Sequence, residues 1–175
     1  LYTEIWDESK TFDQLAQVIL DNNRYSENTK ATVLAAYMNY ARSGNSGYIN
    51  TPGILLTNAV IFSFGGAHLE LGEHYLANEY FPNSNLQMKS ETKKSLTHYY
   101  DFLVGYQNIL RDGGTFYSVN VQSIDGGLTF ETWPASQGSV AVLGKKFNDM
   151  EVIHLINFSQ ANSLEWRDTN GTQKE

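Results

Sequence analysis

Groups that can transfer protons are concentrated in residues 67–88, which read AHLELGEHYLANEYFPNSNLQM. Three glutamates and two histidines lie there among aromatic and amide side chains, directly after a Gly-Gly pair. Carboxyl and imidazole groups are the usual side chains of acid–base catalysis and of metal binding. Because so dense a mixture is unusual in a segment that only packs, we expect a functional site here.

A metal site would have to use His68, Glu70, Glu73 and His74, whose side chains are ligand types for zinc or manganese. Their pattern is H-x-E-x-x-E-H on a predicted strand and loop, whereas the helical pattern H-E-x-x-H places both imidazoles on one face. We therefore expect no metal and favour a hydrogen-bond network that positions Glu70. A metal-dependent hydrolase built on His68, Glu70 and His74 stays open as an alternative.

The elements that must position these groups alternate between strand and helix. Glu4 lies in a candidate strand with alternating β-type residues, and the hydrophobic pattern then predicts a helix that begins after Thr11. This order favours a parallel sheet with right-handed crossovers. In an α/β barrel, strand ends aim side chains into the mouth, so Glu70 would face it. The predicted strands are 2–6, 32–38 and 68–72, and the predicted helices are 11–21 and 55–64.

The pattern changes beyond Gly114. A longer helix is predicted at 90–110, and four short strands follow, separated by Gly, Asp, Asn and Ser turns. They indicate the start of an antiparallel β-sandwich. We expect His154, in the last of them, to be a core histidine with satisfied hydrogen bonds. Trp166 and Arg167 are expected to stack in a polar turn with a structural role. The predicted strands are 116–121, 128–132, 140–143 and 152–158.

Composition excludes several classes of partner. The formal net charge is -7 and no basic run exceeds Lys-Lys, so neither nucleic acid nor anionic lipid is an expected partner. No apolar stretch reaches the roughly 18 residues of a membrane helix. Cysteine is absent, so disulfides and thiolate metal sites are excluded. The chain begins inside a predicted strand without a leader, and we expect it to be a fragment.

Several segments together resemble glycoside hydrolase family 66, a family of endo-dextranases and cycloisomaltooligosaccharide glucanotransferases. They are YTEIW, VLAAYMNY, FSFGGAHLELGEHYLANEYFPN, HYYDFLVGYQNILRDG, HLINF and WRDTNGTQ. The resemblance implies an α/β fold in which residues 1–113 are the C-terminal part of a (β/α)8 barrel, with strands six to eight. Residues 114–175 would then be an incomplete antiparallel β-sandwich.

The same resemblance implies a retaining mechanism with an aspartate nucleophile after strand four and a glutamate acid/base after strand six. A retaining pair of carboxyl groups lies roughly 5 Å apart. Glu4 matches the glutamate, and the nucleophile lies outside this chain. Trp6, Tyr40 and Tyr80 are expected to stack on glucose rings, and hydroxyl groups are expected to be bound by His68, Glu70, Asn78 and Glu79.

We therefore expect part of a retaining endo-α-1,6-glucanase that hydrolyses dextran and isomaltooligosaccharides without a cofactor, secreted by or displayed on a bacterium. Alone, the fragment is expected to be inactive and poorly folded. A cyclising glucanotransferase is the first alternative, although the short connections leave no room for the carbohydrate-binding insertion that cyclising members carry. A non-catalytic glucan-binding module is the second, and residues 78–83 would then simply pack over the barrel rim.

Overall fold

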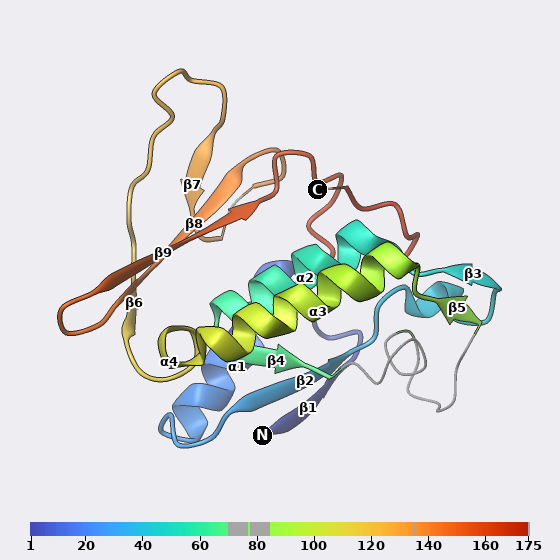
Figure 1. Ribbon diagram of the computed structural model, residues 1–175, viewed down its shortest axis with the longest axis horizontal. Helices are drawn as coiled ribbons and strands as arrows, with labels where there is room; N and C mark the ends of the chain where they lie inside the picture. The colour runs from blue at the N-terminus through green and yellow to red at the C-terminus, as the bar shows by residue number, and fades with distance from the viewer. Residues whose placement is uncertain (70–76, 78–84, 135, 175) are drawn as a thin grey trace.

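The computed structural model describes residues 1–69, 77, 85–134 and 136–174 (Figure 1). The first part of the chain alternates strands and helices, and the last part is mostly strand. The elements are β1 (Tyr2–Ile5), α1 (Phe12–Tyr25), β2 (Thr32–Ala36), η1 (Tyr40–Arg42), β3 (Gly47–Tyr48), α2 (Thr51–Ser63), β4 (Gly66–His68), β5 (Leu86–Gln87), α3 (Ser90–Gly105), α4 (Gln107–Leu110), β6 (Thr115–Tyr117), β7 (Phe130–Thr132), β8 (Val140–Lys146) and β9 (Glu151–Asn157).

The first sheet has three parallel strands in the order β1-β2-β4. Glu4 is in register with Ala35, and Leu34 is in register with His68. The predicted parallel arrangement of these strands is confirmed. The third strand begins at Gly66, two residues earlier than predicted. Gly66 packs closely on Ile19 and Ile61, since a Cβ there would lie 2.9 Å from Ile19 Cδ1.

Helix α1 shows why the local sequence folds as it does. Thr11 is the N-cap predicted for it, and the Gln14 side chain bonds back to the Thr11 backbone in a capping box. Its buried residues recur at helical spacing and face the sheet. The helix continues to Tyr25, past the predicted end at residue 21, because asparagines weaken a helix without breaking it. The buried residues are Phe12, Leu15, Ala16 and Ile19.

Helix α2 is apolar on every side and is buried nearly throughout. It begins at Thr51, four residues before the predicted start, and Pro52 is tolerated in the first turn because the amide it lacks has no helical partner there. Helices α1 and α3 and strand β9 all pack against α2. Figure 1 shows α2 and α3 lying along one face of the β1-β2-β4 sheet. No helix among the described residues is both long and apolar enough to span a membrane.

The C-terminal strands differ from the prediction. Strands β6, β8 and β9 pair antiparallel, but β7 pairs parallel with β8. The described strands here therefore form one mixed sheet, in place of the expected antiparallel sandwich. The parallel pair is possible because β7 has only three residues, so the short connection at 133–139 can span its length. Strand β6 ends at Tyr117, four residues earlier than predicted.

One continuous apolar core joins the two parts of the chain. Phe64 at the end of α2 packs on Phe116 and Trp133, with ring centroids 5.3 and 5.1 Å apart. Phe12 of α1 packs on Phe158, which follows β9, at 5.2 Å. These contacts cross the predicted boundary near residue 113. The division into two domains stays a prediction.

The segment after β9 returns to the first sheet, where a polar turn was expected. The backbone amide of Trp166 donates to the Lys10 carbonyl at 3.2 Å, and its indole donates to the Ser9 carbonyl at 2.7 Å. The carboxylate of Asp168 is buried and accepts from the amides of Thr172 and Gln173 at 2.8 and 3.0 Å. The first turn of α2 thus meets a fixed, buried carboxylate.

Gly53 in that first turn has no room for a side chain, because a Cβ there would lie 2.5 Å from Asp168 Oδ2. We expect Gly53→Ala to lower the free energy of unfolding by about 1–3 kcal/mol, the usual cost of overpacking. Gly105 of α3 is the control, since nothing lies within 4 Å of its Cβ position. Gly105→Ala should be neutral or slightly stabilising. Thermal unfolding of both variants tests this expectation. Equal melting temperatures would contradict the close packing of Gly53 on Asp168.

Candidate functional site

Glu4 projects from the face of the sheet opposite the helices. Side chains alternate along a strand. Thr3 faces α1, since its hydroxyl accepts a hydrogen bond of 2.9 Å from Asn22, and Ile5 is buried in the core. Glu4 therefore points the other way and is exposed. The Tyr2 hydroxyl donates to Glu4 Oε1 at 2.9 Å and orients the carboxylate.

An aromatic group stands at the C-terminal ends of β1 and β2. The ring centroids of Trp6 and Tyr37 are 5.3 Å apart, and those of Trp6 and Tyr40 are 6.1 Å apart, edge to face. Tyr37 is fully buried and supports the other two rings, which are partly exposed. The structure thus brings Trp6 and Tyr40 together at the strand end that carries Glu4. Tyr37 was missed, although its place just after β2 was visible in the tract VLAAYMNY.

His68 faces the helices, away from Glu4. It shares the register position of Leu34, a core residue, and only 3% of its surface is exposed. Its Nε2 lies 2.7 Å from the Ala36 carbonyl and its Nδ1 2.8 Å from Asn58 Oδ1 of α2. Both ring nitrogens therefore lie within hydrogen-bond distance of protein oxygens. These contacts fasten α2 to the sheet, and the role of His68 in binding hydroxyls stays a prediction.

The other predicted site residues cannot be placed. Glu70, Asn78, Glu79 and Tyr80 lie outside the described residues, as do Glu73 and His74 of the alternative metal site. In the part of the chain that the structure does describe, no three acidic, histidine or cysteine side chains are grouped as metal ligands would be. The roles predicted for these residues stay predictions.

A polar pocket of about 340 Å³ lies beside Tyr40. It is formed by the turn after β1, by η1 and by the returning segment, and both acidic and basic side chains line it. The pocket is lined by Asp7, Ser9, Lys10, Tyr40, Ala41, Glu165, Arg167 and Thr169.

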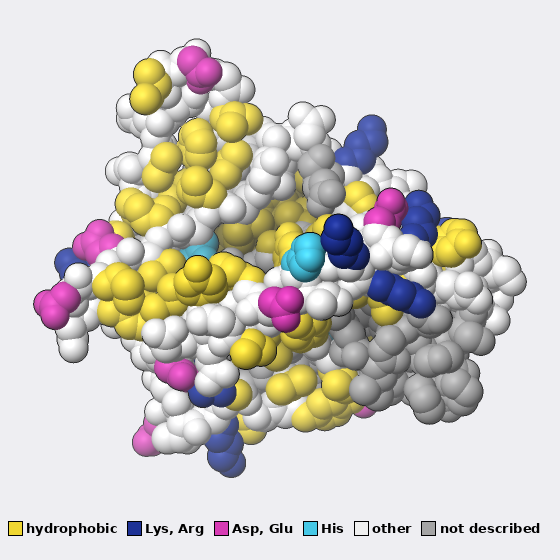
Figure 2. All heavy atoms as spheres, in the orientation of Figure 1, with side chains coloured by type: hydrophobic (Ala, Val, Ile, Leu, Met, Phe, Trp, Pro, Cys, Tyr) yellow, Lys and Arg dark blue, Asp and Glu magenta, His cyan; other side chains and the backbone are white. Residues whose placement is uncertain are grey.

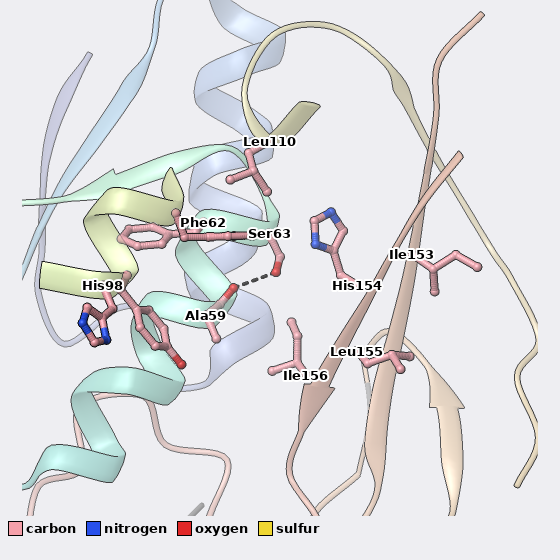
Figure 3. Close-up of a pocket in the computed structure, with 11 residues that line it drawn as sticks. Ala59, Phe62, Ser63, His98, Leu110, Ile153, His154, Leu155 and Ile156 are labelled. Atoms are coloured by element: carbon pink, nitrogen blue, oxygen red, sulfur yellow. Dashed lines mark hydrogen bonds between the residues drawn. The ribbon is translucent and has the colours of Figure 1, made fainter. Parts of the chain in front are cut away.

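A second hollow, of about 480 Å³, lies between α2, α3 and β9. His154 and Ile156 point into it from β9, whereas Ile153 and Leu155 point away (Figure 3). Hydrophobic side chains gather along this hollow on the molecular surface (Figure 2). It lies beside the helices, whereas Glu4 projects from the opposite face of the sheet. It is therefore separate from the strand end that carries Glu4.

The predicted hydrogen bonding of His154 is wrong. Its Nε2 is buried and has no hydrogen-bond partner among the described residues. The facing part of α2 is apolar except for Ser63, whose hydroxyl donates to the Ala59 carbonyl at 2.7 Å instead. Burial, with a smaller effect of the Lys145 charge, lowers the pKa of His154 from 6.5 to about 4. The imidazole is therefore neutral at pH 7.

This pKa makes stability depend on pH. Between pH 6.5 and about 4 the unfolded chain binds a proton at His154 that the folded chain does not, so stability falls as the pH falls. The loss reaches about 3 kcal/mol at pH 4, and the effect vanishes above pH 6.5. Urea unfolding between pH 4.5 and 7.5 should show His154→Gln losing less stability than wild type on acidification. The exposed His98 is the control, since His98→Gln should leave the wild-type pH dependence in place. A His154→Gln profile parallel to wild type would contradict the assignment.

Comparisons with known proteins agree with one another. The sequence model of glycosyl hydrolase family 66 matches residues 1–175. Two cycloisomaltooligosaccharide glucanotransferases from Niallia circulans are 29% identical over 147 residues and 30% identical over 125 residues, covering 73% and 66% of this chain. The chain spans only 14% and 12% of those proteins.

A solved structure resembles this one in fold. It is a cycloisomaltooligosaccharide glucanotransferase from Paenibacillus sp. in complex with cycloisomaltoheptaose, with a TM-score of 0.76. The match covers 95% of this chain and 42% of that chain at 20% sequence identity. At this identity the likeness establishes a shared mixed α/β fold.

Proposed function

Because the chain belongs to glycosyl hydrolase family 66, we propose that it supplies the acid/base end of the active site of a retaining endo-α-1,6-glucanase. The observation that carries the proposal is the position of Glu4. This carboxylate stands at the C-terminal end of a parallel strand, on the face without helices, next to partly exposed aromatic rings. The enzymes named among the relatives act on isomaltooligosaccharides, which are α-1,6-linked glucans.

The proposed architecture assigns β1, β2 and β4 to strands six, seven and eight of a (β/α)8 barrel. Two observations support it. The three strands are parallel and adjacent in chain order, and the helices that contact them lie on one face, as on the outside of a barrel. The sheet of β6 to β9 would then belong to the C-terminal β-domain.

In the proposed mechanism Glu4 acts twice. It first protonates the glycosidic oxygen while an aspartate from outside this chain attacks the anomeric carbon, which forms a glycosyl-enzyme and breaks the bond to the leaving sugar. Glu4 then takes a proton from the water that attacks the anomeric carbon and releases the aspartate. The hydrogen bond from Tyr2 holds the carboxylate in one orientation for both steps.

The aromatic rings provide the proposed sugar-binding surface. Trp6 and Tyr40 are partly exposed and are supported by the buried Tyr37, and glucose rings are proposed to stack on their accessible parts. Tyr80, Glu70, Asn78 and Glu79 are proposed to complete this surface. We place the enzyme outside the bacterial cell, because dextran is too large to cross a membrane.

Hydrolysis and transfer share the glycosyl-enzyme and differ in whether water or a sugar hydroxyl attacks it. We favour hydrolysis because the described connections between strands and helices are short. The glucanotransferase names of the relatives make cyclisation the outcome to test beside it.

The acid/base role is tested by Glu4→Gln in the full-length enzyme. This change keeps the size of the side chain but removes its titratable proton, so hydrolysis of dextran should fall by about 10² to 10⁴-fold. Glu91→Gln is the control, since Glu91 is an exposed glutamate in the first turn of α3 and should leave the rate unchanged. Reducing ends released from dextran, with starch and cellulose alongside, give the rate. Full activity of Glu4→Gln would refute the role.

The products of the same reaction separate the alternatives. Linear isomaltooligosaccharides are expected, and cyclic products would assign the enzyme to the transferase branch. Wild type that binds dextran but releases no product would indicate a glucan-binding module. A chelator should leave the rate unchanged, and a loss would support the metal-dependent alternative.

A further inference from the structure

We infer that Arg167 is a positioning residue for the reaction proposed above, and the inference rests on that proposed function. Arg167 lies in the segment that returns to the first sheet after β9. Its guanidinium reaches the C-terminal end of β1, where it holds the backbone between Glu4 and Trp6. The residue does not contact the substrate in this proposal. It fixes the groups that do.

The guanidinium makes two polar contacts at this strand end. One nitrogen donates to the carbonyl of Ile5 at 3.1 Å, and another lies 2.7 Å from Asp7 Oδ1. Ile5 is the residue between Glu4 and Trp6, and its carbonyl belongs to the peptide bond to Trp6. Displacing this carbonyl would move both side chains together.

The same guanidinium also packs on the aromatic group. Its Cζ lies 5.6 Å from the ring centroid of Tyr40 and 5.1 Å from that of Trp166. Only 12% of the Arg167 side chain is exposed, whereas 90% of its ion-pair partner Asp7 is exposed. The charge is therefore held mainly by packing and by the Ile5 carbonyl, because an exposed ion pair contributes little by itself.

The segment that carries Arg167 is bonded to three parts of the fold. Its carbonyl accepts from the amide of Asn39, just after β2, at 2.9 Å. The adjacent Trp166 is bonded to the turn before α1 through Lys10, and its carbonyl accepts from the Thr57 hydroxyl of α2 at 2.9 Å. Arg167 is therefore held against the end of β1 by a backbone segment that is fixed to the loop after β2, to the turn before α1 and to α2.

Only arginine can make this set of contacts. Its planar fork donates in two directions at once and stacks on a ring, whereas lysine has a single point charge on a flexible stem. Arg167→Lys thus keeps the charge and loses the positioning. A misplacement of about 1 Å in a catalytic group reduces a rate by about 100-fold.

The first test compares two substrates of the full-length enzyme. Dextran needs a proton on its leaving oxygen, whereas a nitrophenyl α-isomaltoside leaves as a stable phenolate without one. If Arg167 positions Glu4, Arg167→Lys should lower kcat/KM about 10- to 100-fold more on dextran than on the nitrophenyl substrate. Arg24→Lys on α1 is the control, because Arg24 is exposed and pairs with Asp21 of its own helix, and both values should stay at wild type. Equal losses on both substrates would overturn the inference.

The second test needs no activity. With 5-fluorotryptophan in the protein, the ¹⁹F resonance of Trp6, assigned through Trp6→Phe, should shift in Arg167→Lys, while that of the distant Trp133 should not. An unchanged Trp6 resonance in a folded variant would contradict the positioning role. If wild type fails to cleave dextran, the proposed function falls, and the Trp6 resonance still decides whether Arg167 fixes this strand end.

Discussion

Helix α2 has no polar face, and this constraint explains the arrangement of the elements around it. An apolar helix must be covered on all sides to leave water, and the chain covers this one with a different element on each side. Helix α2 is covered by the β1-β2-β4 sheet, α1, α3 and β9. The first and last parts of the chain therefore contribute to one core. His68 adds a polar connection between α2 and the sheet, because its ring contacts both Asn58 of α2 and the Ala36 carbonyl at the end of β2.

One face of the sheet is committed to helix packing, and Glu4 projects from the other face. The alternation of side chains along β1 sends Thr3 and Ile5 to the helices and Glu4 away from them. The strand ends need further support, since β1 has only four residues. That support comes from Tyr37 below the exposed rings and from the returning segment, which also seats the buried carboxylate of Asp168 against α2.

Local patterns and family motifs predicted much of this structure from the sequence. The cap at Thr11, the parallel arrangement of the three strands and the membership of family 66 were all predicted from the sequence. The side of the sheet that His68 faces depends on register with Leu34, which a sequence does not display. The parallel pairing of β7 and the unpartnered nitrogen of His154 depend on which surfaces meet in three dimensions. Arg167 was noticed only as a neighbour of Trp166, because its partners at residues 5 and 7 lie at the opposite end of the chain.

The returning segment also has a consequence for synthesis on the ribosome. The contacts that complete the strand end join residues 160, 157 and 129 positions apart, between Arg167 and Asp7, Trp166 and Ser9, and Asp168 and Asn39. Contacts of such long range form late, because the chain between them must be made and its loop closed first. A nascent chain in which β1, β2 and α2 have already formed therefore still lacks these contacts at the C-terminal ends of the strands. It gains the arrangement around Glu4 only when residues 163–173 emerge, so a translation product that stops short of them would carry Glu4 without the segment that braces this strand end.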